Sequence, residues 1–517
     1  MPLNKLISAI LITFLITGCT RPVVPTNTPA ASPSPEPSPT PTTVPKPTTT
    51  YSPAFEVTEC PFEVPKGYAP ICGYLTVPED RSQADGRTIR LAIAVFKSTS
   101  ANPEPDPVIH LAGGPGSSPL GATPFILKNG GNDILAHRDY ILLDQRGVGN
   151  SLPNLYCQPY DEYLWDAHEL DLSLDEYNAG AFPSLEICLT EWRTQGINLA
   201  SYNSAESAAD VNDLRLALGY EQVNLYGTSY GTRLALTVMR DHPEGIRSVI
   251  IDSVYPPESN LDLDLALNAE RTLALLFSAC AESPACTTNY GNLETKFYEV
   301  VDRLETNPVQ VEVNGPYRSS PYRVYLDGDL WIDMIFGGLY SVGSLADLPG
   351  IIQTAYEGRY TELSEIVGGG IGSPLSAGMF WSVFCREEIP FEINITPPPE
   401  AEGIPEQLSK HFSEQYALEI CQLWNIPAAD PVENAPVISD IPTLIFAGQH
   451  DPITPPRYAE STAATLNHAY YYLFPNMAHG VMRSDPCALQ IGLEFLNNPA
   501  LEPDISCMAS LVGFKLP

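Results

Sequence analysis

Short apolar runs alternate with helical patterns over residues 55–257 of the chain. Strands buried on both faces read as continuous Val, Ile and Leu runs, whereas half-buried strands alternate apolar and polar positions. A mostly parallel sheet with helices on both faces is therefore expected here. The predicted strands are 89–96, 108–111, 140–143, 223–226 and 249–252, and the predicted helices are 204–218 and 232–241.

The pattern becomes mostly helical over residues 258–435. Apolar residues at positions 273, 276, 277 and 280 follow the i, i+3, i+4, i+7 spacing of a helix face, and 297–304 repeats it. Strand patterns then return at 443–447 and 470–474. We therefore predict an α/β fold whose core comprises 55–257 and 436–517, interrupted by a helical insertion, here called the cap.

The first residues have the layout of an export signal. Lys5 precedes an apolar run over 6–16, which is too short to span a bilayer, and Gly18-Cys19 resembles a bacterial lipobox. This predicts a signal peptide over 1–18 and a lipid on Cys19 that anchors the protein to a membrane in the cell envelope. The alternative is an ordinary signal cleaved elsewhere, with Cys19 incidental.

Residues 19–54 form a predicted tether. Eleven prolines lie between Arg21 and Pro53, among many Thr and Ser residues. Such a composition cannot form a core and favours extended polyproline II conformations. The tether would hold the folded part away from the membrane.

Charge and cysteine content narrow the classes of protein. Lys and Arg number 27 against 62 Asp and Glu, a formal net charge of −35, which argues against nucleic-acid partners. Besides Cys19 there are ten cysteines, an even number that predicts disulfides in an exported chain. The sequence contains no CxxC or HxxxH pattern, so a metal site is not favoured. Sequence alone leaves the connectivity of the ten cysteines open. Their order along the chain suggests that neighbours pair, as Cys60–Cys72, Cys157–Cys188, Cys280–Cys286, Cys385–Cys421 and Cys487–Cys507.

The strongest chemical motif follows the predicted strand 223–226. Gly227-Thr228-Ser229-Tyr230-Gly231 fits a sharp strand-to-helix turn that exposes a serine hydroxyl above the sheet. As a bare pattern GxSxG is weak, but its position between strand and helix is informative. Ser229 is therefore the candidate nucleophile, and a Gly-rich turn without chemistry is the alternative.

A serine nucleophile needs a base and an acid that holds the base. Asp451 follows the predicted strand 443–447, and His479 follows 470–474, so both lie beyond the carboxyl ends of strands. The order Ser229, Asp451, His479 is the one that this strand context predicts. His450 is interpreted as a bystander.

Acyl transfer also needs donors for the tetrahedral oxyanion. The backbone N–H of Tyr230, next to the nucleophile, is one candidate. The second should come from the loop after 108–111, where adjacent glycines allow an N–H to turn toward the site. Gly114 is the preferred donor there and Gly113 its substitute.

These motifs together resemble the proline iminopeptidase and tripeptidyl aminopeptidase family of α/β hydrolases. The resemblance rests on 112–116 (AGGPG), 144–151 (DQRGVGNS), the turn at Ser229, Asp451 and His479. Ala112 stands where proline iminopeptidases usually have His, which favours the tripeptidyl-aminopeptidase-like branch with its TAP-like C-terminal segment, here 436–517. The family implies that Asp144 and Arg146 brace the loop beside the site.

The resemblance further implies a serine aminopeptidase that cleaves residues or short peptides from the N-terminus of peptides, without a metal or other cofactor. Family members bind the substrate ammonium through cap carboxylates, for which Glu387 and then Glu388 are the candidates, unless both are merely solvated. The alternatives are a carboxylesterase or lipase with the same triad, acting on small esters, and a non-catalytic binding lipoprotein. The expected partners are thus a small substrate and, through the anchor alone, a membrane.

Overall fold

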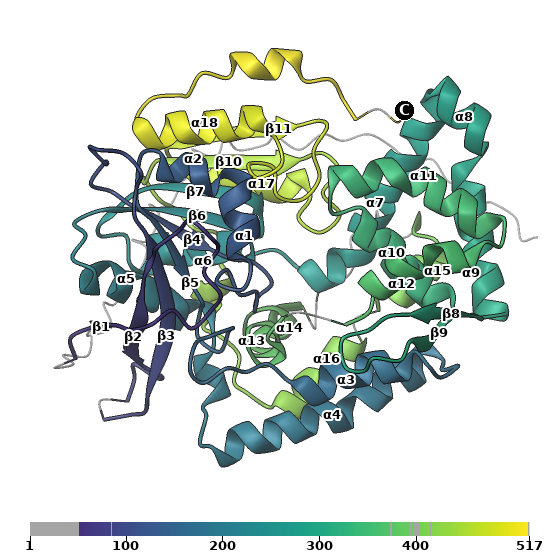
Figure 1. Cartoon of the computed structure of the whole chain (residues 1–517), viewed down its shortest axis with the longest axis horizontal. Coiled ribbons are helices and arrows are strands. Elements are labelled where there is room, and N and C mark those ends of the chain that lie inside the picture. The colour runs from purple at the N-terminus through teal and green to yellow at the C-terminus, as the bar shows by residue number, and fades with distance from the viewer. Residues whose placement is uncertain are drawn as a thin grey trace, which may run out of the picture. The chain divides into compact units, whose positions relative to one another are not determined.

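The catalytic motifs are carried by a mixed β-sheet (Figure 1). A computed structural model describes residues 51–83, 85–372, 375–392, 395, 401, 403–413, 415–514 and 516. The predicted signal, Cys19 and the tether up to residue 50 lie outside the described residues.

Within the described residues the sheet has nine strands in the order β1-β2-β3-β5-β4-β6-β7-β10-β11. The strands from β5 to β11 in this order pair in parallel, whereas β1, β2 and β3 join antiparallel at one edge. The predicted mostly parallel sheet is thus confirmed. The strands are β1 (Ala54–Val57), β2 (Ile71–Pro78), β3 (Thr88–Phe96), β4 (Val108–Leu111), β5 (Tyr140–Leu143), β6 (Val223–Ser229), β7 (Ile246–Val254), β10 (Thr443–Gly448) and β11 (Ala469–Phe474).

Helices cover both faces of this sheet. Because successive side chains of a strand point to opposite faces, Ile109 joins one apolar cluster and Val108 the other. The first face packs against α5 (Ser204–Ala217), α6 (Tyr230–Asp241) and α17 (Pro456–Thr465). The second packs against α1 (Thr123–Ile126), η1 (Leu127–Gly131), α2 (Asn132–Leu135) and α18 (Pro486–Asn497).

The cap follows β7 and has an apolar core of its own, which includes the buried Phe297 and Trp331. The sequence did not predict its small antiparallel sheet of β8 (Val309–Val313) and β9 (Tyr322–Leu326). Its helices are α7 (Leu261–Glu282), α8 (Pro284–Tyr290), α9 (Leu293–Thr306), α10 (Gly328–Gly338), α11 (Val342–Tyr356), η3 (Tyr360–Leu363), α12 (Ser364–Gly369), α13 (Ala377–Val383), η4 (Phe384–Glu388), α14 (Ile389–Glu392), α15 (Glu406–His411), α16 (Gln415–Trp424) and η6 (Pro431–Asn434).

Two helices that precede the nucleophile in sequence extend the helical region. α3 (Gln158–Ala167) and α4 (Leu174–Thr194) lie beside α16 in Figure 1, and side chains of α4, α13, η4 and α16 share one apolar cluster. The helical layer over the sheet is therefore built from two stretches of sequence, of which residues 258–435 supply the larger. Short 3-10 helices lie at η2 (Leu199–Ser201) and η7 (Ser506–Ser510).

All five expected disulfides are present: Cys60–Cys72, Cys157–Cys188, Cys280–Cys286, Cys385–Cys421 and Cys487–Cys507. Such bonds persist in oxidising compartments and indicate an extracytoplasmic protein. No helix in the described part of the chain has the length and apolar character needed to cross a bilayer.

Candidate active site

Ser229 ends β6 in a strained backbone conformation, with φ 58° and ψ −129°, and α6 begins at the next residue. A side chain at either flanking glycine would collide with backbone. A Cβ at Gly231 would lie 1.9 Å from the carbonyl oxygen of Leu111, and one at Gly227 would lie 2.3 Å from that of Gly231. The sharp turn predicted from the motif is therefore present, and it presents the hydroxyl at the end of the sheet.

Asp451 and His479 meet although 28 residues separate them. Asp451 follows β10 and is fully buried, and its Oδ2 lies 2.8 Å from Nδ1 of His479. Thr454 donates its amide N–H and its hydroxyl to the same carboxylate, both at 2.8 Å. Burial alone would raise the pKa of Asp451, but the charge of His479 and these hydrogen bonds lower it below the ordinary value. An ionised Asp451 thus orients the imidazole.

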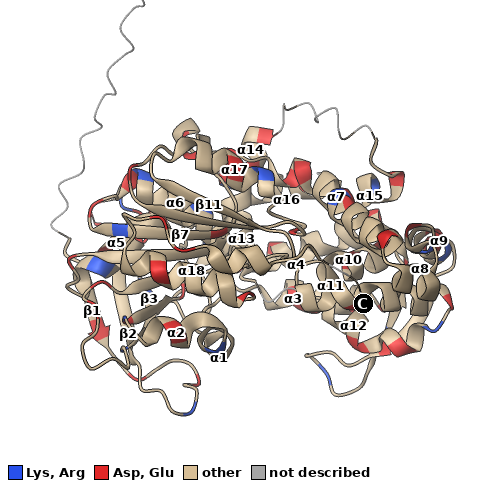
Figure 2. Cartoon of the chain, turned by 90° about the horizontal axis from the view of Figure 1, so that it is seen from above, with Lys and Arg blue, Asp and Glu red and all other residues tan. Residues whose placement is uncertain are grey.

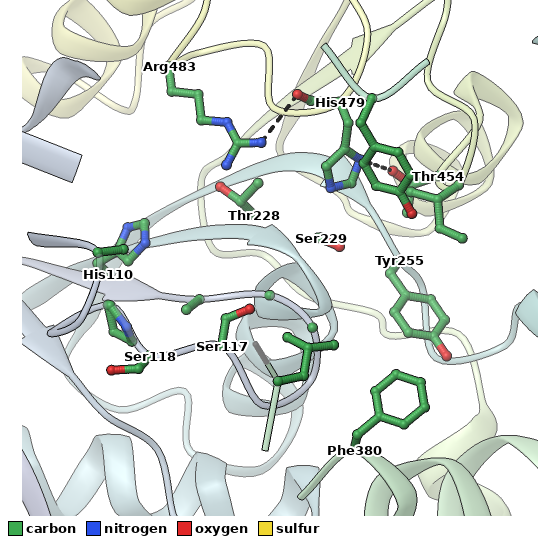
Figure 3. A pocket seen from close by; sticks show the side chains of 18 of the residues that line it. His110, Ser117, Ser118, Thr228, Ser229, Tyr255, Phe380, Thr454, His479 and Arg483 are labelled. Carbon is green, nitrogen blue, oxygen red and sulfur yellow. Dashed lines mark hydrogen bonds between the residues drawn. The ribbon is translucent and has the colours of Figure 1, made fainter. Parts of the chain in front are cut away.

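Ser229 and His479 line one cavity and lie near each other in Figure 3. Within the part of the chain that the structure describes, their side chains do not form a hydrogen bond to each other. In free enzymes this contact is often long and tightens when substrate binds. The arrangement is that of a serine nucleophile, a base and an acid.

The glycine loop after β4 lies against the nucleophile. A Cβ at Gly113 would lie 2.8 Å from Cβ and 3.3 Å from Oγ of Ser229. Gly114, the preferred donor, follows Gly113 directly and lines the same cavity as Ser229. Tyr230 is the first residue of α6, where an N–H has no intrahelical acceptor. Gly114 and Tyr230 therefore remain the candidate oxyanion donors.

The loop that carries His479 is fastened to the end of β7. Asp252, fully buried, accepts the amide hydrogens of Val481 at 2.8 Å and Met482 at 2.9 Å. Ser253, at φ 61°, accepts the amide hydrogen of Gly480 at 2.8 Å. Burial outweighs these bonds and raises the pKa of Asp252. These contacts fix the backbone immediately after the imidazole.

The cap also supports His479. Tyr340, just beyond α10, accepts the amide hydrogen of His479 on its carbonyl at 3.1 Å. Its ring packs edge-on against the imidazole at a centroid distance of 5.3 Å. His479, the candidate base, is thus held from both the core and the cap.

The structure does not place Glu387 and Glu388 at the cavity. Both are 1% exposed, and neither is among the residues that line it. Glu387 accepts hydrogen bonds from the amide and hydroxyl of Ser204, both at 2.6 Å, and its carboxylate lies 3.2 Å from Nε of Arg233. Glu388 binds Arg233 as well. The prediction that they bind the substrate amine is corrected, because both carboxylates are buried against the Arg233 guanidinium of α6 and do not reach the cavity.

Asp144 and Arg146 have the bracing contacts that the resemblance implied. Asp144 accepts hydrogen bonds from the hydroxyl of Ser118 at 2.7 Å and the amide of Asn150 at 2.7 Å, which ties it to the glycine loop. Arg146 is fully buried and binds Asp210 of α5 at 2.8 Å. His450 does not line the cavity, in agreement with its interpretation as a bystander.

The cavity in front of Ser229 has a volume of about 600 Å³. Most of its lining is apolar, including Phe336, Leu375, Phe380 and Phe384 from the cap. Among the Asp and Glu residues that the structure describes, Asp262 in the first turn of α7 lines the cavity. A cavity of this size with an apolar lining and a few polar groups is typical of a site for a small organic ligand.

Several residues at this site were not predicted. Thr454 lies three positions after Asp451, and Asp252 ends a predicted strand, so position alone could have suggested both. Tyr340, Asp262 and Arg483 gave no comparable signal, because a cap helix and a loop bring them to the cavity.

Comparison with known proteins supports this architecture. Residues 106–288 match the family model described as α/β hydrolase fold, and residues 407–507 match that described as TAP-like protein. The chain is 30% identical to a tripeptidyl aminopeptidase of Streptomyces lividans over 208 residues, which is 38% of each chain. That match spans well under half of the relative's length.

Longer but weaker matches also occur. The chain is 22% identical to serine protease Hip1 of Mycobacterium tuberculosis over 455 residues, covering 81% of this chain and 83% of the relative. The crystal structure of proline iminopeptidase from Mycobacterium smegmatis is 17% identical, covers 83% of this chain and 98% of its own, and aligns with a TM-score of 0.40.

Proposed function

The chain is an α/β hydrolase with a TAP-like C-terminal segment, and from this premise we propose that it is an exported serine aminopeptidase. The observation that carries the proposal is that Ser229 and His479 line one cavity of about 600 Å³ and that Asp451 binds the His479 imidazole. The similarity to a tripeptidyl aminopeptidase and a serine protease favours peptides over other acyl substrates.

The proposed cycle uses this chain's own residues. His479 takes the proton of the Ser229 hydroxyl, and the serine oxygen attacks the carbonyl carbon of the scissile peptide bond. The N–H groups of Gly114 and Tyr230 stabilise the oxyanion. His479, held by Asp451, then gives its proton to the departing amine, and water releases the acyl group by the same steps.

Asp262 replaces Glu387 and Glu388 as the proposed partner of the substrate ammonium. It lines the cavity, and a carboxylate in a partly closed site pairs well with an ammonium group. A blocked N-terminus carries no charge and cannot form this ion pair, which disfavours binding. The enzyme should therefore distinguish free from acetylated N-termini.

The anchor belongs to the same proposal. The disulfides support an extracytoplasmic location, and the lipobox at Cys19 would supply a lipid that holds the enzyme to the cell envelope. Incorporation of labelled fatty acid into the wild-type protein, and its loss in Cys19→Ala, tests the anchor.

The activity is tested with matched chromogenic peptides, free and N-acetylated, and with short-chain esters. The wild type should cleave the free peptides at least about tenfold better than the acetylated ones, the worth of one charged hydrogen bond. Asp262→Asn should abolish most of this preference by raising KM, whereas Asp347→Asn on the exposed surface of α11 should not. Cleavage of the esters alone would favour the carboxylesterase alternative and contradict the proposal.

A further inference from the structure

Arg483 brings a positive charge to the catalytic cavity. Its guanidinium donates to the carbonyl oxygen of His479 at 3.4 Å and lies 5.8 Å from the ring centroid of Phe125. Within the described residues, no Asp or Glu oxygen lies within 4.0 Å of it. The chain has a net charge of −35, and its Asp and Glu residues are spread over core and cap (Figure 2), so a cation in the cavity that holds the nucleophile stands out.

The nearest buried carboxylate does not satisfy this cation. Asp252 is close enough for the charge of Arg483 to lower its pKa in part, against the larger effect of burial. However, Asp252 already accepts the amide hydrogens of Val481 and Met482. Arg483 therefore retains hydrogen-bonding capacity for a group that enters the cavity.

The two sides of the cavity differ in chemistry. Figure 3 shows Arg483, His110 and Ser118 on one side of Ser229, and Tyr255 and Phe380 on the other. His110 is bound to the Tyr140 hydroxyl at 2.9 Å, and burial, assisted by the charge of Arg483, lowers its pKa to about 4. His110 is therefore neutral at physiological pH, and the positive charge on this side belongs to Arg483.

The reaction geometry assigns the two sides to the two halves of a substrate. His479 protonates the departing amine, so the leaving fragment passes beside the imidazole. Arg483 donates to the main-chain carbonyl of that same residue, so its guanidinium lies beside the loop that carries the imidazole. Asp262, close in sequence to Tyr255 and lining the same cavity, is left for the acyl fragment and its ammonium.

We propose that Arg483 forms a subsite for a carboxylate on the leaving fragment of the peptide. This inference rests on the proposed aminopeptidase function and narrows its substrates to peptides that carry a negative charge shortly after the scissile bond. The carboxylate can be the C-terminal one of a short oligopeptide or the side chain of an acidic residue. A guanidinium recognises both through the same paired hydrogen bonds.

The test uses three peptides with identical residues before the scissile bond and a free N-terminus. One ends in a free carboxylate two residues after that bond, the second is its carboxamide, and the third is the carboxamide with Glu directly after the bond. The wild type should cleave the first or third with a kcat/KM about tenfold above that of the second, the worth of one charge-assisted hydrogen bond. Whichever of the two is preferred identifies the source of the carboxylate.

Arg483→Gln should bring the ratio of kcat/KM between the charged peptides and the neutral carboxamide close to one, whereas Arg483→Lys should retain part of the preference. Arg323→Gln, an exposed arginine on β9, is the matched control and should behave as the wild type. Equal cleavage of all three peptides by the wild type would overturn the subsite, as would an equal loss on all three in Arg483→Gln.

Failure of the proposed function gives a different result. In that case no peptide is cleaved, although Ser229 still reacts with a fluorophosphonate. Protection of Ser229 from the fluorophosphonate by a bound peptide then measures peptide binding without cleavage. The subsite predicts stronger protection by the acid than by the carboxamide in the wild type but not in Arg483→Gln, and equal protection in both would contradict it.

Discussion

Buried carboxylates occupy two regions of this molecule with different consequences. Asp451, at the end of β10, accepts hydrogen bonds from two backbone amides, a hydroxyl and His479, and its pKa is lowered. Glu388, in η4 of the cap, shares the Arg233 guanidinium with Glu387, and burial raises its pKa to about 7. At Asp451 the charge of His479 and the hydrogen bonds outweigh burial, whereas at Glu388 burial outweighs the charge of Arg233.

The two sets of carboxylates also differ in role: Asp451 acts in the proposed reaction, whereas Glu387 and Glu388 join the cap to the core. Asp451 is ionised next to a group that gains and loses a proton, so its charge enters the reaction. Arg233 lies on α6, directly after the nucleophile, and its two glutamates lie in the cap, so their interaction joins core and cap. Removal of a carboxylate should therefore reduce the rate in the first region and alter stability in the second.

The largest expected effect concerns Asp451→Asn. The amide cannot stabilise the protonated imidazole, so kcat should fall by about 10⁴-fold, as in other serine triads. Because the substitution is nearly isosteric, the near-UV circular dichroism should remain that of the wild type. A loss below about tenfold, with the fold intact, would mean that Asp451 is not the acid of the triad.

Two glycines, one beside the nucleophile and one in the cap, provide the next test. Gly113→Ala places a methyl group 2.8 Å from Cβ of Ser229 and should lower kcat by about 10²–10³-fold, the usual cost of a disturbed oxyanion site. Gly337→Ala, on an exposed turn of α10 with no atom within 4 Å of the added carbon, is its control. That variant should retain activity and be slightly more stable to heat, since Ala favours a helix over Gly. Equal activity of the two variants would remove Gly113 from the site.

The smallest effect is a pH dependence of stability at Glu388. Its carboxyl group has a raised pKa in the folded state, so its contribution is full below the unfolded pKa near 4.5 and is lost as the pH rises through about 7. Glu388→Gln cannot ionise and should lack this loss. Between pH 4.5 and 7 the free energy of unfolding of the wild type should therefore fall relative to that of the variant by on the order of 1–3 kcal/mol. The Tm of the wild type should fall with it. Parallel curves would contradict the raised pKa.

Asp451 should show the opposite sign. Its lowered pKa contributes stability that is present above the unfolded pKa near 3.8 and is lost as the pH falls further. The stability difference between wild type and Asp451→Asn should therefore shrink on acidification below that pKa, rather than on a rise toward neutral pH.

The core was predictable from the sequence, and a triad could be proposed, because each candidate catalytic residue follows a strand whose pattern is visible. Parallel strands end at the same edge of a sheet, so Ser229, Asp451 and His479 were expected to converge. The order of the cysteines also predicted the five disulfides correctly.

The cap was less predictable, for a physical reason. Glu387 and Glu388 lie in a π-helical turn, and sequence alone cannot show that this turn faces Arg233 rather than the cavity. Likewise, Asp262 and Arg483 reach the cavity through tertiary packing of α7 and of the loop after β11, which leaves no periodic trace in the sequence.

Covalent labelling tests most directly whether these loops form a working catalytic centre. A fluorophosphonate probe should react with the intact protein, and Ser229→Ala, of wild-type circular dichroism, should remain unlabelled. His479→Ala should react far more slowly, because no base then activates the hydroxyl. Equal labelling of wild type and Ser229→Ala would show that the nucleophile lies elsewhere and would contradict the account.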